Sequence, residues 1–174
     1  MTCPSEVSTS MGLGGGEPPA GYLLRVTIPG DPVGKGRPRL STRGGHARAY
    51  TPAKTRTWEA GAALVLRNAH RGAPIASPVR VVVNAVQERP KRLVPRSAGG
   101  SFPVSQVCPL NRMLRPTKPD ADNVLKAVLD ALVLAGVILD DVQAVEVVAR
   151  SLYGYLGETS RVEVEVTVLT GGVS

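Results

Sequence analysis

The sequence predicts an α+β fold: a single compact domain in which a mixed β-sheet packs against two main helices. At 174 residues the chain is long enough for one hydrophobic core and too short for two. The expected order of elements is strand, helix, strand, long loop, helix, strand, strand, with no internal repeat. The last strand gives a clear signal, because apolar and polar residues alternate without error from Val162 to Val168.

The composition divides the chain into three parts. Residues 1–21 are rich in Ser, Gly and Pro and lack periodicity, so we expect a disordered leader. Residues 22–170 are the expected folded domain, and residues 171–174 are a short tail. No stretch approaches the roughly 20 apolar residues of a membrane span. The two cysteines, Cys3 and Cys108, lack the spacing of a zinc site. These features predict a cytoplasmic protein without membrane contact.

The elements of the first half are marked by composition and by their end signals. Tyr22 to Ile28 has strand composition and stops at a Pro-Gly breaker. Thr51-Pro52 is typical of a helix start, with Thr as the N-cap and Pro at the first helical position. The helix is expected to run to about Asn68, with Trp58 on its buried face. Val79 to Val86 is the expected second strand.

The second half begins with an irregular stretch. Gln87 to Pro116 is rich in Pro and has no period, so it is expected to be a long loop. The second helix is expected from Asp122, as its N-cap, to Leu134, with Gly136 ending it. Val142 to Leu152 and Arg161 to Leu169 are strand-like, and a Gly-bearing turn joins them.

Charge is segregated along the chain. Eighteen basic residues and three acids lie between Tyr22 and Lys118, whereas Pro119 to Ser174 holds three basic residues and nine acids. We interpret the basic stretch as a surface for a polyanion and the acidic stretch as a holder of cations. One Trp, one Phe and four Tyr are too few for a protein that stacks single-stranded bases on several exposed rings.

Acidic side chains gather around the second predicted helix. Asp120 and Asp122 are two residues apart in the turn that opens it, and Lys126 follows Asp122 by one helical turn. Asp140-Asp141 follow the helix, and an antiparallel return could bring them beside the first pair. Four converging carboxylates require protonation or a divalent cation, and oxygen ligands suit Mg²⁺ or Mn²⁺.

Such a site has an obvious chemistry and an ordinary alternative. A metal held there can activate water and stabilise the leaving oxygen of a phosphodiester, while Lys126 stabilises the added charge or positions the water. Alternatively, Asp is a favoured helix cap, the spacing of Asp122, Lys126 and Asp130 makes surface ion pairs, and Asp-Asp is frequent in turns. The combination beside a basic half-chain favours the catalytic interpretation.

The motif KPDADNVLK at residues 118–126 resembles the signature of the RusA family of Holliday junction resolvases. LDAL at 129–132 and DDVQ at 140–143 continue the resemblance. PVGKGRPR at 32–39 and YTPAKT at 50–55 are similar to the N-terminal motifs of that family, and VEVEV at 162–166 also fits. The resemblance covers roughly Val26 to Val168.

The resemblance implies a homodimeric endodeoxyribonuclease of DNA recombination and repair that resolves four-way junctions by paired symmetric nicks. It implies Mg²⁺, for which Mn²⁺ can substitute, and no nucleotide cofactor. The acidic site residues fall on Asp120, Asp122 and Asp141, with Asp140 adjacent, and the essential base-type residue falls on Lys126. Family members are often borne by phages or prophages. Where the family commonly has Lys after the Asp pair, this chain has Arg150.

Basic residues of the first half are the expected DNA contacts. The candidate phosphate ligands are Lys35, Arg37, Arg39, Lys54 and Lys118, with Gly34 and Gly36 letting the backbone approach closely. A second basic patch, or a set of merely exposed side chains, is expected from Lys91, Arg92, Arg96, Arg112 and Arg115.

Two other functions fit the sequence. One is a non-catalytic DNA-binding protein, in which the Asp cluster is only a capped turn. The other is a general branched-DNA nuclease, which shares the chemistry and differs in substrate. Intact Asp120, Asp122, Lys126 and Asp141 favour an enzyme, since a purely binding protein gains nothing from acids that face phosphate.

Overall fold

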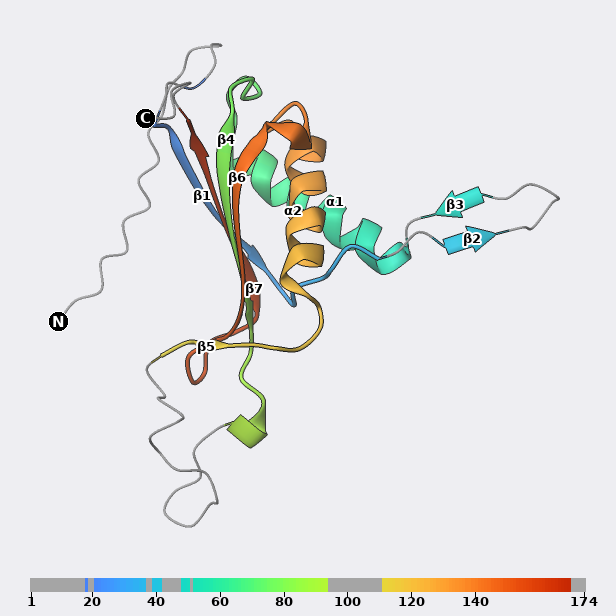
Figure 1. Ribbon diagram of the computed structural model, residues 1–174, viewed down its shortest axis with the longest axis vertical. Helices are drawn as coiled ribbons and strands as arrows, with labels where there is room; N and C mark the ends of the chain where they lie inside the picture. Colours follow the sequence, from blue (N-terminus) through green and yellow to red (C-terminus); the bar gives the residue numbers. More distant parts are fainter. Residues whose placement is uncertain are drawn as a thin grey trace.

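A five-stranded sheet with both helices on one face forms the body of the molecule (Figure 1). This computed structural model describes residues 18, 21–36, 39–41, 48–50, 52–93 and 111–169. The predicted α+β class, with a mixed sheet and two main helices, is confirmed. None of the helices in the described ranges is long and apolar enough to cross a membrane.

The strand order of the sheet is β1-β7-β4-β6-β5. The strands are β1 (Leu23–Pro29), β4 (Val79–Gln87), β5 (Met113–Leu114), β6 (Ala144–Tyr153) and β7 (Arg161–Val168). β4 and β6 pair in parallel, and the other neighbours are antiparallel. A separate hairpin joins β2 (Arg39–Ser41) to β3 (Arg48–Tyr50). The strands β2 and β3 were not predicted from the sequence, and β5 lies within the stretch that was expected to be a long loop.

The core lies between the helices and one face of the sheet. Alternate residues of β7 from Val162 to Val168 are buried, as the period of two predicts. They lie beside buried residues of the neighbouring strands β1 and β4 on the same face of the sheet. Against them pack Leu66 of α1 (Ala53–Ala69) and Leu132 of α2 (Ala121–Ala135). Trp58 lies partly buried against the same core, as expected.

The helix boundaries differ from the expected ones by one or two residues. Pro52 is the N-cap of α1, so it lies just outside the helix, and Thr51 falls outside the described residues. Asp120, with extended backbone, is the N-cap of α2, and its carbonyl accepts the first helical hydrogen bond from Val124. Asp122 is therefore in the first turn and is not the cap. Gly136 ends α2 in the left-handed conformation, as predicted.

The chain between α2 and β6 is more structured than its composition suggested. A short 3₁₀ helix, η3 (Asp141–Gln143), precedes β6, so the strand begins at Ala144 and not at Val142. Asp140 caps η3 by accepting from the Val142 N–H, and the Gln143 side chain accepts from the Asp140 N–H in return. β6 and β7 are consecutive in sequence but are not neighbours, because β4 lies between them.

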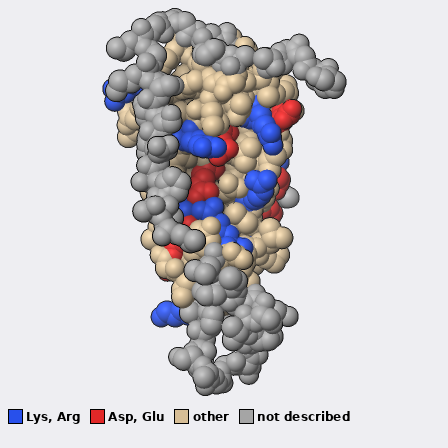
Figure 2. Space-filling model, turned by 90° about the vertical axis from the view of Figure 1, so that its left-hand side faces the viewer, with Lys and Arg blue, Asp and Glu red and all other residues tan. Residues whose placement is uncertain are grey.

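Among the residues that the structure describes, the opposite face of the sheet carries no helix, and it is polar. Basic and acidic side chains are interspersed on this side of the molecule (Figure 2). Ion pairs join neighbouring strands here, Arg25 with Glu165 at 3.0 Å and Arg80 with Glu146 at 3.7 Å. All four residues are at least partly exposed, so each pair contributes little stability.

Candidate active site

The predicted catalytic motif lies at the exposed start of α2. The Asp120 side chain makes no capping hydrogen bond, so its carboxylate is not used by the helix. Lys126 Nζ lies 3.4 Å from Asp122 Oδ2, and both side chains are more than half exposed, at 62% and 64%. The structure thus brings Asp120, Asp122 and Lys126 together on the surface of one helical end.

Arg115 holds the turn that leads into this motif. Its guanidinium is buried and donates to the carbonyls of Lys118 at 2.7 Å and Pro119 at 3.1 Å, and to the Thr117 hydroxyl at 3.3 Å. The Lys118–Pro119 peptide bond is cis. Burial lowers the pKa of Arg115, and the charges of Tyr153 and Asp120 oppose this shift. The prediction of an exposed basic patch is wrong for Arg115, because the fold uses its guanidinium internally.

An open pocket of about 580 Å³ lies beside the motif. It is lined by Gly34, Lys35, Lys118, Pro119, Asp120 and Asn123. The Lys35 N–H donates to the Asn123 carbonyl at 2.8 Å, which fixes the Gly34 loop to the start of α2. A second, smaller hollow of about 390 Å³ includes Arg115, Thr117, Lys118 and Tyr153, so Lys118 lines both.

The two glycines of this loop allow close approach to the protein itself. A Cβ on Gly34 would lie 3.1 Å from side-chain atoms of Asn123 and Pro119, and one on Gly36 would lie 2.7 Å from Pro52 Cγ. The close approach expected at these glycines occurs, and the neighbour in the structure is the protein itself. In the structure the absence of side chains lets the loop pack between the starts of both helices.

Lys35, a predicted DNA contact, is engaged within the protein. Its ammonium pairs with Asp130 of α2 and lies 3.3 Å from Glu59 of α1. Burial lowers the pKa of Lys35, but hydrogen bonds and charge from Asp130 and Glu59 outweigh burial and raise it. Lys35 therefore links the loop to both helices.

The remaining predicted DNA contacts are only partly described. Lys118 is exposed at the pocket, and Lys54 is exposed in the first turn of α1. Arg37 lies outside the described residues, and Arg39 is placed in β2 by its backbone alone.

Asp140 and Asp141 lie far from the motif within one chain. Asp120 precedes α2 and Asp140 follows it, and this helix of 15 residues spans roughly 22 Å at 1.5 Å per residue. β6 runs from the Asp140 end to the β5 end of the molecule, where the motif lies (Figure 1). No group of three or more His, Cys, Asp or Glu in the described ranges is placed to hold a metal. The expected return of Asp140-Asp141 to the first pair does not occur within one chain.

The Asp140-Asp141 pair has its own electrostatics. The Val142 N–H, followed by the Asp141 carboxyl, lowers the pKa of Asp140 through hydrogen bonds. The hydrogen bond to Asp140 and its charge raise the pKa of Asp141. Both side chains are exposed.

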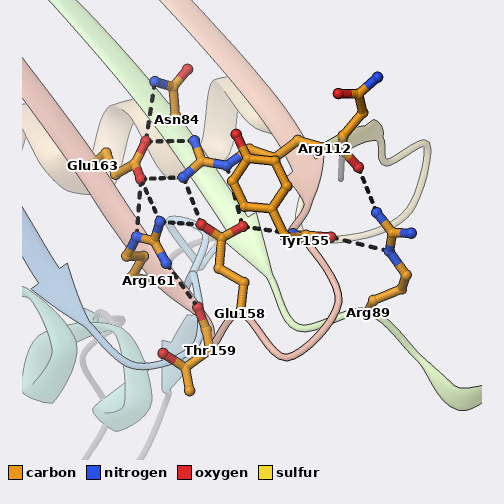
Figure 3. Close-up of polar contacts among 10 residues, drawn as sticks. Asn84, Arg89, Arg112, Tyr155, Glu158, Thr159, Arg161 and Glu163 are labelled. Carbon is orange, nitrogen blue, oxygen red and sulfur yellow. Dashed lines mark hydrogen bonds and ion pairs between the residues drawn. The ribbon is translucent and has the colours of Figure 1, made fainter. Parts of the chain in front are cut away.

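A network of ion pairs that the sequence did not reveal fastens the chain before the motif (Figure 3). Arg112 donates to Glu163 at 2.6 and 2.8 Å and to Glu158 at 2.9 Å, and Arg161 bonds the same two carboxylates. The Arg112 guanidinium also lies 5.3 Å from the Tyr155 ring centroid. Arg112 is thus a structural anchor and not part of a basic patch. The 46 and 51 residues that separate it from its partners hid this role.

The donor set at the start of α2 fits a hard divalent cation. Mg²⁺ typically takes one or two carboxylates and completes its shell with water and substrate phosphate. Asp120 and Asp122 offer two exposed carboxylates beside an open pocket, and the Asp120 carboxylate makes no capping hydrogen bond. The residues present therefore suit Mg²⁺ or Mn²⁺ and not a softer metal that requires His or Cys.

Comparison with known proteins agrees with the motif. The family model described as "Endodeoxyribonuclease RusA" matches residues 29–167. The chain is also similar to "Uncharacterized protein YqaN" of Bacillus subtilis (strain 168), with 33% identity over 141 residues that cover 81% of this chain and 93% of that protein. Members of this family hydrolyse phosphodiester bonds in DNA, and a non-catalytic binding protein is thereby set aside. This chain belongs to the RusA endodeoxyribonuclease family.

Proposed function

We propose that the protein is a homodimeric, Mg²⁺-dependent resolvase that cuts four-way DNA junctions by paired symmetric nicks during recombination and repair. Mn²⁺ substitutes for Mg²⁺ in this proposal. The observation that carries it is the grouping of Asp120, Asp122 and Lys126 beside the open pocket at Lys118, in a chain of an endodeoxyribonuclease family. A DNA substrate also accords with the predicted place of action, the cytoplasm.

Each residue of the motif has a distinct role in the proposal. Asp120 and Asp122 hold the cation, which when bound acts as a Lewis acid toward the scissile phosphate. Lys126, positioned by Asp122, offsets the charge that develops on the phosphate and orients the attacking water. Lys118 contacts a phosphate of the same strand at the rim of the pocket.

A dimer suits a junction because two strands must be cut. Two copies related by a two-fold axis present two identical sites, which is the symmetry of paired nicks. The separation of Asp141 from Asp120 and Asp122 within one chain adds a reason for a second subunit, because all three belong to the proposed site.

The test offers the purified protein a labelled four-way junction and a linear duplex of the same sequence, each with Mg²⁺, Mn²⁺ or a chelator. Symmetric nicks in the junction alone, with either metal and not with chelator, are expected. Cutting of both substrates would make the protein a general nuclease. Tight binding without nicks under any divalent metal would overturn the proposal.

A further inference from the structure

The turn that connects α2 to β6 carries the two adjacent acids of the DDVQ motif. The chain is anchored on both sides of this turn, since Ile138 is buried and Ala144 is partly buried against the core. Between these anchors, Leu139 and Val142 are 59% and 77% exposed. Exposed apolar side chains contribute little stability, so the conformation of the turn depends on its polar contacts.

The side chain of Gln143 makes four hydrogen bonds at this turn. Its Oε1 accepts from the N–H groups of Leu139 at 2.7 Å and Asp140 at 2.9 Å. Its Nε2 donates to the carbonyls of Ile75 at 2.9 Å and Ser77 at 3.2 Å. An amide oxygen has two lone pairs and an amide nitrogen has two protons, so the hydrogen-bonding capacity is used in full. Two donors on one side and two acceptors on the other also fix the orientation of the amide.

These hydrogen bonds join the acidic turn to the connection between α1 and β4. Ile75, in that connection, is fully buried, and its N–H donates to the Val137 carbonyl at 2.8 Å. Ile75 also forms a parallel bridge with Ile138. The backbone of the connection is therefore fixed to the chain that follows α2. Gln143 extends this attachment to the two peptide units that lead into Asp140.

The two acids differ in how the turn uses them. The Asp140 carboxylate is engaged within the turn, because it accepts from the Val142 N–H at 3.0 Å. The backbone N–H of Gln143 donates to the Asp140 carbonyl at 3.2 Å and closes the turn around Asp141. Asp141 itself is exposed, so its side chain faces solvent from a backbone that is held on both sides.

The placement of an acidic turn matters when it supplies a metal ligand. Mg²⁺ demands near-ideal octahedral geometry, so a small displacement of one oxygen weakens binding. Groups that orient a ligand without touching the metal change metal affinity or activity by roughly 10–100-fold when they are removed. Gln143 has the chemistry of such a group, because both lone pairs of its oxygen are already taken by the turn.

We propose that Gln143 is a positioning residue of the active site, which sets the place of Asp141 by joining its turn to the α1–β4 connection. In this role it touches neither the metal nor DNA. The inference rests on the proposed function, in which Asp141 belongs to the site. A primary amide of this length is required, because it accepts from two N–H groups and donates to two carbonyls at once.

Two variants of Gln143 and one matched control separate position from charge and from stability. Gln143→Met keeps the length of the side chain and removes all four hydrogen bonds. Gln143→Glu keeps an acceptor for the two N–H groups and sets a carboxylate oxygen against the two carbonyls. Arg67→Ala is the control, because Arg67 of α1 donates to the carbonyls of Leu134 and Ala135 at the end of α2, before the turn begins.

Mn²⁺ binding without DNA, followed by electron paramagnetic resonance, is a measurement that does not depend on nicking. Gln143→Met is expected to weaken Mn²⁺ binding about tenfold, and Arg67→Ala is expected to leave it unchanged. Gln143→Glu should also weaken it, although an added negative charge alone would tighten the binding of a cation. The Mg²⁺ concentration for half-maximal junction nicking should rise about tenfold in Gln143→Met.

Hydrogen exchange shows whether the turn has loosened. The amides of Leu139 and Asp140 are expected to exchange faster in Gln143→Met than in the wild type, and at the wild-type rate in Arg67→Ala. Faster exchange with unchanged Mn²⁺ affinity would make Gln143 a structural residue only and overturn the inference. Equal weakening of Mn²⁺ binding by Arg67→Ala would also overturn it. If Gln143→Met does not fold, Gln143→Glu decides by the same measurements.

The outcomes distinguish this inference from the proposed function. If wild-type protein nicks junctions and Gln143→Met has the same Mn²⁺ affinity and Mg²⁺ dependence, the positioning role is wrong and the resolvase stands. If wild-type protein binds Mn²⁺ but nicks no DNA, and both Gln143 variants bind Mn²⁺ more weakly, the resolvase fails and the positioning role stands. A wild-type protein that binds no Mn²⁺ overturns the positioning role.

Discussion

The guanidinium of Arg115 and the carbonyl of Lys118 are joined by a 2.7 Å hydrogen bond. A second bond from the same guanidinium reaches Pro119, the residue before Asp120. Because Arg115 is buried and its N–H pairs with the Ser151 carbonyl of β6, the acidic motif is fastened directly to the sheet.

Replacing Arg115 by Ala should therefore destabilise the fold and displace the motif. Two carbonyls lose a charged donor, and we expect the free energy of unfolding to fall by about 3 kcal/mol. Arg115→Lys keeps the charge without the forked geometry and should recover only part of the loss. Urea unfolding measures both, with exposed Lys118→Ala as a control that changes stability by less than about 0.5 kcal/mol. Equal stability of Arg115→Ala and wild type would contradict the anchoring role.

Replacing Asp122 by Asn should abolish nicking while DNA binding is kept or tightened. The substitution removes a metal ligand and also a negative charge that repels phosphate. The ion pair of Asp122 with Lys126 is exposed, so the stability should change by less than about 1 kcal/mol. Nicking assays and fluorescence anisotropy on the same junction measure the two effects. Wild-type nicking by the variant would remove Asp122 from the mechanism.

Lys118 and Lys35 should differ in their effect on DNA binding, although both were predicted to contact phosphate. Lys118 is exposed at the pocket, so Lys118→Ala should reduce the slope of log K against log salt by about 1. Lys35→Ala should leave that slope unchanged, because Asp130 and Glu59 already pair with its ammonium. Lys35→Ala should lower the free energy of unfolding by about 2 kcal/mol, because the largely buried Glu59 carboxylate would lose its cationic partner. A lower slope for Lys35→Ala would show that DNA displaces those partners.

The network around Glu158 should make stability depend on acid pH. Burial alone would raise the pKa of Glu158, but hydrogen bonds from Arg112, the Tyr155 N–H and Arg161 lower it to about 2. Because the pKa of Glu158 is lower in the folded protein, its contribution to the free energy of unfolding is fully present above the pKa of the unfolded chain, near 4.5. That contribution is lost as pH falls toward 2. The contribution is about 3 kcal/mol, and Glu158→Gln should flatten the fall in stability between pH 5 and 2. Urea unfolding across that range measures it, and parallel curves would exclude Glu158 as a source.

Replacing Gly36 by Ala and replacing Gly61 by Ala should have opposite effects on the stability of the fold. A Cβ on Gly36 would lie 2.7 Å from Pro52 Cγ, so Gly36→Ala should cost roughly 1–3 kcal/mol. Gly61 lies in α1 with nothing within 4 Å of its added Cβ, so Gly61→Ala should stabilise by roughly 0.5–1 kcal/mol. Thermal unfolding of both variants measures the difference. A stable Gly36→Ala would show that the loop can move away from α1.

The sequence was sufficient for elements whose signals are local. The alternation of β7, the apolar stripe of α2 and the left-handed Gly136 depend on residues that are close in the chain, and each is confirmed. Asp140-Asp141 lie at the far end of α2 because the helix separates them from Asp120, and η3 leads directly into β6. The sequence did not show that the returning chain reaches the end of the molecule that holds the motif only at the end of β6, where β5 pairs with it, because strand pairing depends on the tertiary fold.

The charge segregation along the chain serves partly to form ion pairs within the protein, and not only to bind a polyanion as the sequence suggested. Basic residues of the first stretch pair with acids of the second, as Lys35 does with Asp130 and Arg112 does with Glu158. Composition cannot distinguish a cation that awaits DNA from one that meets its own chain, because contacts across 95 or 46 residues depend on the tertiary fold.

The hydrogen bonds of Arg89 and Arg112 hold the chain on both sides of residues 94–110, and this affects where sequence length can vary within the family. Arg89 donates to the carbonyls of Asn111 and Gly154, so the chain ends that flank residues 94–110 are fixed to each other and to the turn before β7. Lengthening a connection whose ends are already held costs little, roughly 0.6 kcal/mol for each doubling of its length. Insertions and deletions between Leu93 and Asn111 can therefore accumulate over evolution, while the geometry of the acidic motif is inherited unchanged.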